Sequence, residues 1–428
     1  IVYSSMDNEV ATVDENGVIT AVGEGTTYIK VKDQNNEVTN AIKVSVTIKN
    51  NETQPKVVGG GYYFAALKGN GTVYTWGYNG SGQLGLGDTN NRTEPTQTNM
   101  KAVIDIAAGT DHTLVLKADG TVWTWGYNGY GQLGLGDNSN RYRPRQINIE
   151  NVVDIAAGNN HALLVTADGK VYSFGSNSYG QLGRTGNTYT PQEIPNLENI
   201  EKVSAGNYHS IALDKDGNVY TWGYNGYGQL GLGNTTNTVL PVKVDDLEGI
   251  IKIEAGNYTS YVIDNNNHLW STGYNYYGEL GNGSTSNRSK FTQIQTLENV
   301  SDVSASETNS TIVLLSDGTV WGFGNNTNNQ LTTVGGATPQ QLKGPDGMLK
   351  DITSISVGYY TGYAITSEEK VLAWGLNNYS QLASGTTETK STPVYMKEKD
   401  GNDFTDSMIV SGGRYSAELA KSDGTVWG

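Results

Sequence analysis

The sequence predicts an all-β fold, in which a ring of repeated strand units, a β-propeller, follows a short β-sandwich. Three observations lead to this prediction. An aromatic-Gly-x-Asn step recurs seven times at intervals of 48 to 51 residues, each step is accompanied by short β-rich runs joined by turns, and the 428 residues include 55 Gly and no Cys. Repetition at a fixed period is typical of propellers and related repeat architectures.

The recurring step divides the chain after about residue 57 into units. Its occurrences are Trp76-Gly77-Tyr78-Asn79, Trp125-Gly126-Tyr127-Asn128, Phe174-Gly175-Ser176-Asn177, Trp222-Gly223-Tyr224-Asn225, Thr272-Gly273-Tyr274-Asn275, Phe323-Gly324-Asn325-Asn326 and Trp374-Gly375-Leu376-Asn377. The apolar runs between the steps are too short for helices to be preferred, so we expect three or four strands in each unit.

Each unit also contains a hairpin signal. In the second unit, the alternating run Leu114-Val115-Leu116 meets the turn pair Asp119-Gly120, and the chain returns as Val122-Trp123. Dipeptides of this kind favour tight turns between antiparallel strands. Equivalent pairs are Asn70-Gly71, Asp168-Gly169, Asp216-Gly217, Asn266-Asn267, Asp317-Gly318, Glu368-Glu369 and Asp423-Gly424.

The units are expected to close into a ring of seven blades. A unit of about 50 residues cannot bury both faces of its sheet alone, and radial closure leaves few exposed strand edges. The first hairpin occurs eight times but the loop after it only seven times. We expect the surplus copy, residues 411–428, to act in closure or to belong to a continuation, because an eight-bladed ring would need residues beyond 428.

The pattern AAG-x-x-H-x-L-x-L-x-x-D-G-x-V-W-x-W-G-x-N-x-x-G-Q-L-G recurs over residues 57–428. It resembles the regulator of chromosome condensation repeat, a family of seven-bladed β-propellers. The sixth and seventh units depart from it, since Asn329-Gln330-Leu331-Thr332 and Ser380-Gln381-Leu382-Ala383 lack the glycines around Gln-Leu. The resemblance implies that the chain binds partner proteins through loops on one face, and it implies no substrate.

Residues 1–49 have a different character. Short runs such as Val18–Val22 and Tyr28–Val31 are separated by glycine turns, which predicts a β-sandwich. The stretch SSMDNEVATVDENGVITAVGEGTTYIKV is similar to the bacterial immunoglobulin-like group 2 domain, and the similarity starts in mid-domain, so we expect a truncated sandwich and an internal fragment. Residues 50–56 are interpreted as a linker and residues 57–428 as the propeller.

Charge and composition exclude several functions. The chain has 28 Lys and Arg against 43 Asp and Glu, a net charge of −15, so we expect no nucleic-acid partner. It has no cysteine for a disulfide, a thiolate zinc site or a nucleophile, and no run of 18 apolar residues for membrane insertion. Because no Ser-His-Asp order, phosphate-binding loop or isolated carboxylate pair stands out, we predict a protein that is not an enzyme and needs no cofactor.

Three of the four histidines share one repeat position. His112, His161 and His209 each lie three residues after a glycine, and three ring-related imidazoles would suit a metal cluster. The equivalent positions of the other units are assigned to Phe64, Thr259, Asn309 and Thr361. Because that position accepts groups that cannot bind metal, we interpret the histidines as strand-start side chains that bond to backbone, and predict no metal site.

The asparagine of the step and a leucine five residues later do not vary between units. They are Asn79, Asn128, Asn177, Asn225, Asn275, Asn326 and Asn377, and Leu84, Leu133, Leu182, Leu230, Leu280, Leu331 and Leu382. We interpret them as one repeated structural solution, in which Asn bonds to its own loop and Leu fills the space between blades. The glutamine before each leucine, replaced by Glu279 in the fifth unit, belongs to the same set. Loops such as GDTNNRT lack the ordered charges of a calcium site and are interpreted as solvated turns.

Tyrosine is the most informative residue that varies between units. It follows the step or recurs three residues later, and in a ring these loops would emerge on one face, where amphipathic rings suit protein and sugar recognition. The candidate binding face is Tyr78, Tyr127, Tyr130, Tyr179, Tyr224, Tyr227, Tyr274, Tyr277 and Tyr379. The alternative is that the rings fill gaps between blades and expose only their hydroxyl groups.

The predicted function is a non-catalytic binding module of a bacterial cell-surface or secreted protein, with a protein or glycan as its partner. The two resemblances, a spacer-like sandwich and a propeller, lead to this prediction. One alternative is guanine-nucleotide exchange on a small GTPase, the activity associated with eukaryotic members of the propeller family. The others are inhibition of a secreted enzyme and lectin-like binding of sugars.

Overall fold

All regular structure among the described residues is β-strand, as the short alternating apolar runs predict. The computed structural model describes residues 2–6, 11–13, 19–21, 25–32, 38–46, 56–306, 308–378, 382, 384, 386–397, 407–412, 417–421 and 426–427. The chain divides into two compact units, Ile1–Glu52 and Thr53–Gly428. The all-β prediction is confirmed, and no helix capable of crossing a membrane occurs in the described part.

The unit Ile1–Glu52 contains two small antiparallel sheets. One has the strand order β1-β4-β5, and the other pairs β2 with β3. Their bounds are β1 Val2–Ser5, β2 Ala11–Val13, β3 Ile19–Ala21, β4 Gly25–Lys32 and β5 Val38–Val46. Ile29 of β4 is fully buried, which gives this unit an apolar centre of its own.

The unit Thr53–Gly428 contains seven four-stranded antiparallel sheets, each with its strands in sequence order. The first three are β6 Lys56–Gly59, β7 Tyr63–Leu67, β8 Val73–Gly77 and β9 Arg92–Gln97; β10 Val103–Ala108, β11 His112–Lys117, β12 Val122–Gly126 and β13 Arg141–Gln146; and β14 Val152–Ala157, β15 His161–Thr166, β16 Val171–Gly175 and β17 Gln192–Glu193. The fourth and fifth are β18 Ile200–Ala205, β19 His209–Asp214, β20 Val219–Gly223 and β21 Thr238–Lys243; and β22 Ile250–Ala255, β23 Thr259–Asp264, β24 Leu269–Gly273 and β25 Arg288–Gln293. The sixth and seventh are β26 Val300–Ala305, β27 Ser310–Leu315, β28 Val320–Gly324 and β29 Gly336–Gln341; and β32 Ile352–Val357, β33 Thr361–Thr366, β34 Val371–Gly375 and β35 Lys390–Tyr395.

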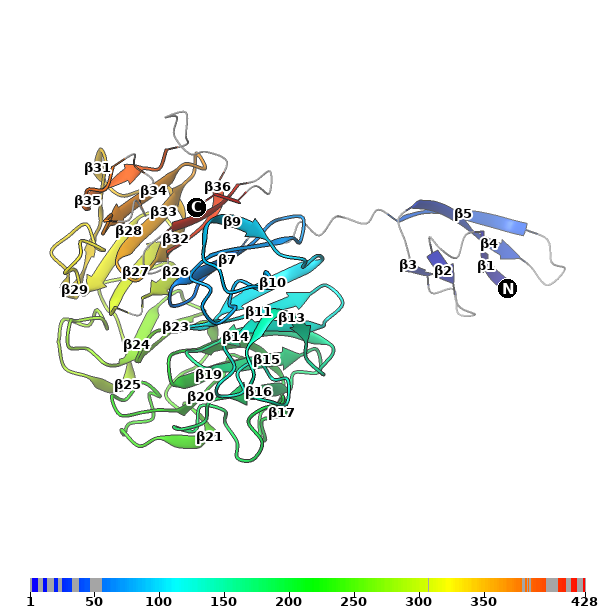
Figure 1. The fold of residues 1–428 in the computed structure, drawn as a ribbon, viewed down its shortest axis with the longest axis horizontal. Helices are drawn as coiled ribbons and strands as arrows, with labels where there is room; N and C mark the ends of the chain where they lie inside the picture. The colour runs from blue at the N-terminus through cyan, green and yellow to red at the C-terminus, as the bar shows by residue number, and fades with distance from the viewer. Residues whose placement is uncertain are drawn as a thin grey trace. The chain divides into compact units, whose positions relative to one another are not determined.

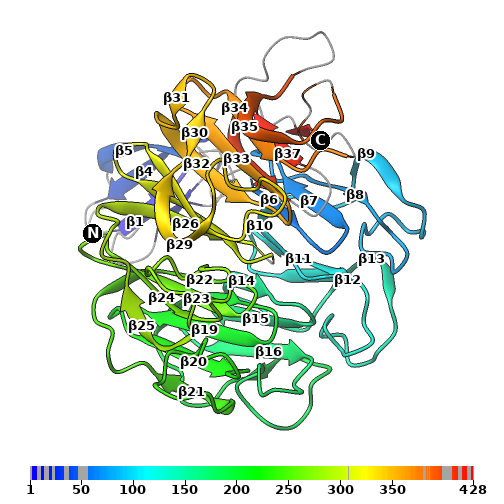
Figure 2. The same cartoon turned by 90° about the vertical axis from the view of Figure 1, so that its left-hand side faces the viewer.

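The sheets follow one another around a ring (Figures 1 and 2). The first strand of each sheet contacts the first strand of the next, so these strands surround a central axis. A further sheet of β36 Ser407–Gly412, β37 Ala417–Lys421 and β38 Val426–Trp427 completes the circle, because β36 contacts both β32 and β6. A short hairpin of β30 Lys343–Gly344 and β31 Gly347–Met348 lies between the sixth and seventh sheets in sequence.

The hairpin turns require a residue with positive φ. In the second sheet, Gly120 has a φ of 76°, and its N–H donates to the carbonyl of Lys117 at 2.9 Å. Where the sequence lacks this glycine, Asn267 and Glu369 adopt φ angles of 62° and 61°. The turn shape is thus kept at a cost of about 1 kcal/mol for a residue with a Cβ atom.

Apolar side chains fill the space between neighbouring sheets. Leu67 of the first sheet packs in one cluster with Val115 and Trp125 of the second. The indole Nε1 of Trp125 donates to the backbone carbonyl of Gln83 at 2.8 Å, which joins the loop of one sheet to the next. The seven repeated leucines are each 1% exposed or less, so their predicted place in the core is confirmed.

Candidate functional site

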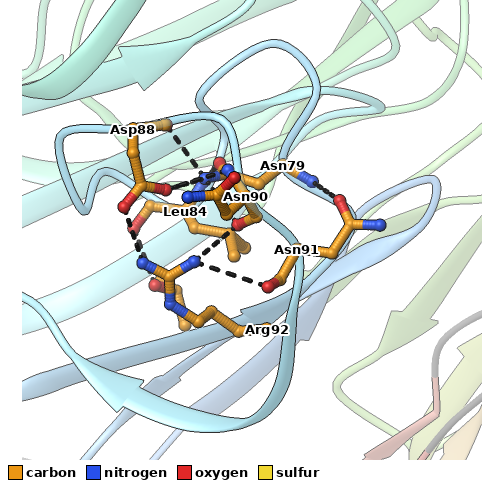
Figure 3. Close-up of polar contacts among 7 residues, drawn as sticks. Asn79, Leu84, Asp88, Asn90, Asn91 and Arg92 are labelled. Carbon is orange, nitrogen blue, oxygen red and sulfur yellow. Dashed lines mark hydrogen bonds and ion pairs between the residues drawn. The ribbon is translucent and has the colours of Figure 1, made fainter.

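A long loop joins the third and fourth strands of each sheet and is built around the asparagine of the repeated step. In the first sheet, Asn79 Oδ1 accepts the N–H of Leu84 at 3.0 Å. Its Nδ2 donates to the carbonyls of Asp88 and Asn90 at 3.0 and 3.1 Å (Figure 3). Arg92 Nη2 pairs with Asp88 Oδ2 at 2.7 Å. The loop oxygens that resemble calcium ligands in sequence are therefore engaged by N–H donors of the same loop.

The bond from the leucine N–H to the asparagine Oδ1 recurs in all seven long loops, at distances of 2.7 to 3.0 Å. An asparagine amide that makes this bond closes the loop over five residues, which explains why the asparagine does not vary between units. The leucine supplies only its backbone N–H to this bond, and burial of its side chain explains why it does not vary. The predicted structural role of the asparagines is confirmed.

In the first two sheets, the glutamine before the leucine connects the long loop to the next sheet. Gln132 Oε1 accepts the N–H of Tyr130 at 2.9 Å, and its Nε2 donates to Asn160 Oδ1 at 2.9 Å. Gln83 reaches Asp111 Oδ1 in the same way at 2.8 Å. Gln132 therefore fixes the backbone of Tyr130 and is itself fixed to the next sheet.

Eight of the nine predicted tyrosines lie in the described part of the chain, and Tyr379 lies outside it. The most exposed are Tyr78, Tyr130, Tyr179 and Tyr277, with exposed fractions of 46%, 51%, 40% and 38%. The half-buried ones are Tyr127, Tyr224, Tyr227 and Tyr274. Because strands alternate in direction, the long loops emerge at the same end of the sheets as the short loops between the first and second strands.

The structure brings four of these residues together with two tyrosines of the short loops. We call Tyr179, Tyr208, Tyr224, Tyr227, Tyr258 and Tyr274 the tyrosine cluster. Ring centroids lie 5.4 Å apart for Tyr179–Tyr208, 5.0 Å for Tyr179–Tyr224, 5.2 Å for Tyr227–Tyr258 and 4.9 Å for Tyr227–Tyr274. These edge-to-face contacts extend over the third, fourth and fifth sheets. The other predicted tyrosines form separate pairs, Tyr78 with Tyr62, Tyr127 with Tyr130 and Tyr277 with Tyr276.

Tyr208 and Tyr258 were not among the predicted site residues. Each precedes the first residue of the second strand, at the position that Asp111 and Asn160 occupy in the second and third sheets. Where Tyr258 stands, the glutamine of the preceding loop has no side-chain acceptor, and Gln229 Nε2 is buried without a hydrogen-bond partner. Tyr258 therefore takes the place of a residue that could accept a hydrogen bond from Gln229 Nε2, and the unpaired buried amide costs about 1–3 kcal/mol of stability.

Three phenols of the tyrosine cluster have raised pKa values. Burial, reinforced by the neighbouring phenols, raises the pKa of Tyr258 to about 12, and burial also raises the pKa values of Tyr224 and Tyr274. These three hydroxyl groups therefore keep their protons at neutral pH. The cluster can donate and accept hydrogen bonds and offers ring edges for packing, but it supplies no nucleophile.

At the histidine position, two of the three rings connect neighbouring sheets. His161 Nε2 lies 3.0 Å from Ser210 Oγ, and His209 Nε2 lies 2.9 Å from Ser260 Oγ. His112 faces Ala162 at the corresponding place, and neither of its ring nitrogens has a partner. Burial lowers the pKa values of His112, His161 and His209 to about 3, 3 and 4, so the rings are neutral.

The strand register corrects two of the assigned equivalences. Tyr63 pairs with Gly77, and Ser310 with Gly324, as His112 pairs with Gly126. The residues equivalent to His112 are therefore Tyr63 and Ser310, rather than Phe64 and Asn309. The loop before Ser310 is one residue longer than the loop before His112, whereas Tyr63 lies three residues after Gly60, as His112 lies three residues after Gly109. Among the described residues, no group of three His, Cys, Asp or Glu side chains could hold a metal ion.

The first strands of the sheets surround a central cavity of about 460 Å³. Two ion pairs lie on its wall, Lys56 Nζ to Asp105 Oδ1 at 2.6 Å and Lys202 Nζ to Asp154 Oδ1 at 3.1 Å. Glu254 also lines it, and burial raises the pKa of this carboxyl group to about 7 against the opposing effect of a nearby lysine. The wall therefore carries two ion pairs and a further carboxyl group, and the hydroxyl groups of Ser204 and Ser304 on it accept backbone N–H groups.

Comparison with known proteins identifies the family. The RCC1-like domain matches residues 20–343, and the regulator of chromosome condensation (RCC1) repeat matches residues 352–381 and 368–419. The RCC1 domain-containing protein RUG3, mitochondrial, of Arabidopsis thaliana is 31% identical over 120 residues, which are 27% of this chain and 26% of that protein. The human regulator of chromosome condensation is 28% identical over 111 residues, 26% of each chain. The chain thus matches about a quarter of the length of these relatives.

Solved structures of similar fold cover more of the chain. Human WBSCR16 superposes with a TM-score of 0.66 at 21% identity, over 82% of this chain and 99% of that one. Prp20p from Saccharomyces cerevisiae, whose binding to Gsp1p and histones has been described, superposes with a TM-score of 0.66 at 22% identity, over 82% and 91%. These similarities establish a shared fold.

The comparisons correct the predicted location. The sequence analysis placed the protein at a bacterial surface or outside the cell, whereas the relatives named here are eukaryotic, one is mitochondrial and none is extracellular. That prediction was wrong because it rested on the immunoglobulin-like resemblance of residues 1–49, which no comparison supports. The propeller prediction rested on the repeats, and these are what the family shares. With residues 20–343 matched, more than half of its length, the chain belongs to the RCC1-like domain family.

Proposed function

We propose that this protein is a non-catalytic binding module that recognises a partner protein through the tyrosine cluster. One observation carries the proposal. Six tyrosines from three sheets gather on one end of the ring, and one of them, Tyr258, stands where an acceptor for the buried amide of Gln229 would be. A surface that is kept at a cost to the interior is expected at a functional site.

The chemistry of the cluster favours binding over catalysis. Tyrosine supplies a large contact area with little loss of conformational entropy, and it is enriched at the energetically important centres of protein interfaces. The loops beneath the cluster are fixed by the asparagine and glutamine bonds, so the rings are held in place before a partner arrives. Such preorganisation reduces the entropic cost of association.

A small GTPase is the leading alternative to an unclassified partner. RCC1 homologues bind proteins that include Gsp1, a small GTPase, and histones. An exchange activity on a GTPase would still be exerted through contact between loops and partner, since the described residues supply no visible reactive group. The net charge of −15 favours a protein partner over nucleic acid.

The test uses the whole chain and two tyrosine variants. Peptides are selected from a displayed random library against the unmodified protein, and their affinities are measured for Tyr179→Ala/Tyr227→Ala and for Tyr142→Ala. Tyr142 is 45% exposed and belongs to β13, outside the cluster, which makes it a matched control. A nucleotide-free small GTPase, core histones and a glycan array are measured in the same way.

We expect the double variant to bind its ligands at least about tenfold more weakly, and Tyr142→Ala to bind as the unmodified protein does. Unchanged binding by the double variant, together with a lower melting temperature, would show that the rings only fill gaps between sheets. A hit on the glycan array that the double variant abolishes would instead favour lectin-like binding.

The architecture also carries two proposals. We infer that the seven four-stranded sheets are seven blades and that β36–β38 closes the ring between the last and the first; the contacts of β36 with both neighbours support this. We also infer that residues 1–49 form an immunoglobulin-like sandwich, joined by residues 50–56 to a propeller over residues 57–428. The two antiparallel sheets with buried Ile29 support the sandwich.

A further inference from the structure

A second surface, rich in positive charge rather than in tyrosine, lies at the other end of the strands. A cavity of about 390 Å³ is lined by Lys101, Lys117, Arg143 and Arg145, with Trp123 among its apolar wall residues. Lys117 is the last residue of β11. The long loop with its tyrosines follows Gly126, which pairs with the first residue of β11, so the cavity and the tyrosine face lie at opposite ends of this strand.

Four cationic side chains converge here in an acidic protein. Lys101, Arg143 and Arg145 are exposed, and none of the three forms an ion pair with any described residue. The fourth, Lys117, lies 3.4 Å from Asp119. Because the chain as a whole has a net charge of −15, a local excess of positive charge stands out from the field of the rest of the molecule.

The repeat itself does not require these cations. In the other outer strands, the residues equivalent to Arg143 are Glu94, Thr190, Leu240, Lys290, Thr338 and Thr392. The residues equivalent to Arg145 are Thr96, Gln192, Val242, Thr292, Gln340 and Val394. Lys101 stands where the next four units have Glu150, Glu198, Glu248 and Glu298. Since the fold accepts neutral or acidic residues at these positions, the packing of the ring does not explain the three cations of the second sheet.

We propose that this cavity binds an acidic segment of a partner protein. Guanidinium groups bind carboxylates through paired hydrogen bonds, and two of them on one strand can engage successive acidic side chains. Trp123, which is only partly buried, offers apolar surface to the carbon atoms of such a segment. The volume falls in the range of sites that enclose an organic ligand, and a bare inorganic anion would leave most of it empty.

Lys290 offers a matched control. It occupies the position of Arg143 in the fifth sheet, but its Nζ is paired with Asp246 Oδ2 at 2.7 Å. Replacing either residue by Glu changes the net charge of the protein equally. A general electrostatic effect would therefore weaken anion binding equally in the two variants, whereas a built site would respond only to Arg143.

The probe is a fluorescein-labelled octaglutamate peptide, and its binding to the whole protein is followed by fluorescence anisotropy. Inorganic phosphate and octalysine are compared with it. We expect saturable binding of octaglutamate that weakens as ionic strength rises, about tenfold weaker binding by Arg143→Glu, and little change for Lys290→Glu. The melting temperature of each variant verifies that it is folded.

Three results would overturn the proposal. They are the absence of saturable octaglutamate binding, equal loss of binding in Arg143→Glu and in Lys290→Glu, and binding of inorganic phosphate as tight as that of the peptide. The last would assign the cavity to a small anion. None of these results bears on the tyrosine cluster, because both variants leave its residues unchanged.

Discussion

Glu279 offers a sharp test of how the long loops are held. It replaces the glutamine found in the other six loops, it is 1% exposed, and its Oε1 has no hydrogen-bond partner, while its Oε2 accepts the N–H of Tyr277 at 2.8 Å. Burial raises the pKa of Glu279 from 4.5 to about 7. We predict that Glu279→Gln stabilises the protein, and that the gain grows as the pH rises.

The sign follows from the two pKa values. Below pH 4.5 the carboxyl group is protonated in both the folded and the unfolded protein. Between pH 4.5 and 7 the unfolded protein loses this proton first, so folding is penalised by about 1.4 kcal/mol for each pH unit. Above pH 7 the penalty reaches its full value of about 3 kcal/mol. The glutamine side chain does not titrate, and its Nε2 can donate to Asn309 as Gln132 does to Asn160.

Urea unfolding followed by intrinsic fluorescence at pH 5 and at pH 8 measures the difference between the two proteins. Comparison of Glu279→Gln with the unmodified protein isolates Glu279 from other titrating groups such as Glu254. We expect a difference in unfolding free energy of at most about 1 kcal/mol at pH 5 and about 3 kcal/mol at pH 8. An equal difference at both pH values would refute the argument from burial.

Five further substitutions test the connections between sheets, the loops and the turns. Ala162→Ser supplies the hydroxyl group that His112 lacks, and should raise the free energy of unfolding by about 1 kcal/mol. Ser210→Ala removes the partner of His161 and should lower the free energy of unfolding by about 1–3 kcal/mol. A fall for Ala162→Ser together with a rise for Ser210→Ala in urea unfolding would reject the pairing. Asn128→Ala removes the acceptor of the Leu133 N–H and the donor to the Asp137 carbonyl, and should lower the free energy of unfolding by about 3 kcal/mol. Amide hydrogen exchange in that loop should become faster, and an unchanged exchange rate would contradict this role. Glu369→Gly relieves a φ of 61° and should raise the free energy of unfolding by about 1 kcal/mol, which is measured as a slightly higher melting temperature. Glu368→Gly beside it should not raise the melting temperature.

The sequence predicted the parts of the fold that depend on nearby residues. The Asn128 amide reaches Leu133 only five residues away, and the turn at Gly120 spans a few residues, so fixed spacing and residue type were enough to identify both. The all-β ring followed because the same spacing recurs in every unit. The family resemblance, read from the same repeats, was confirmed.

Other features depended on the tertiary structure. The tyrosine cluster combines the predicted Tyr224 and Tyr227 with Tyr258 of a different loop, and the cationic cavity combines Lys101 with Arg143 across three connections of the chain. The partner of His161 lies 49 residues away in the next sheet. Repeat spacing determined which bonds form inside a unit. Ring closure brought each unit against its neighbours and so decided which side chains meet, because contacts between sheets depend on the register and tilt of strands about 50 residues apart.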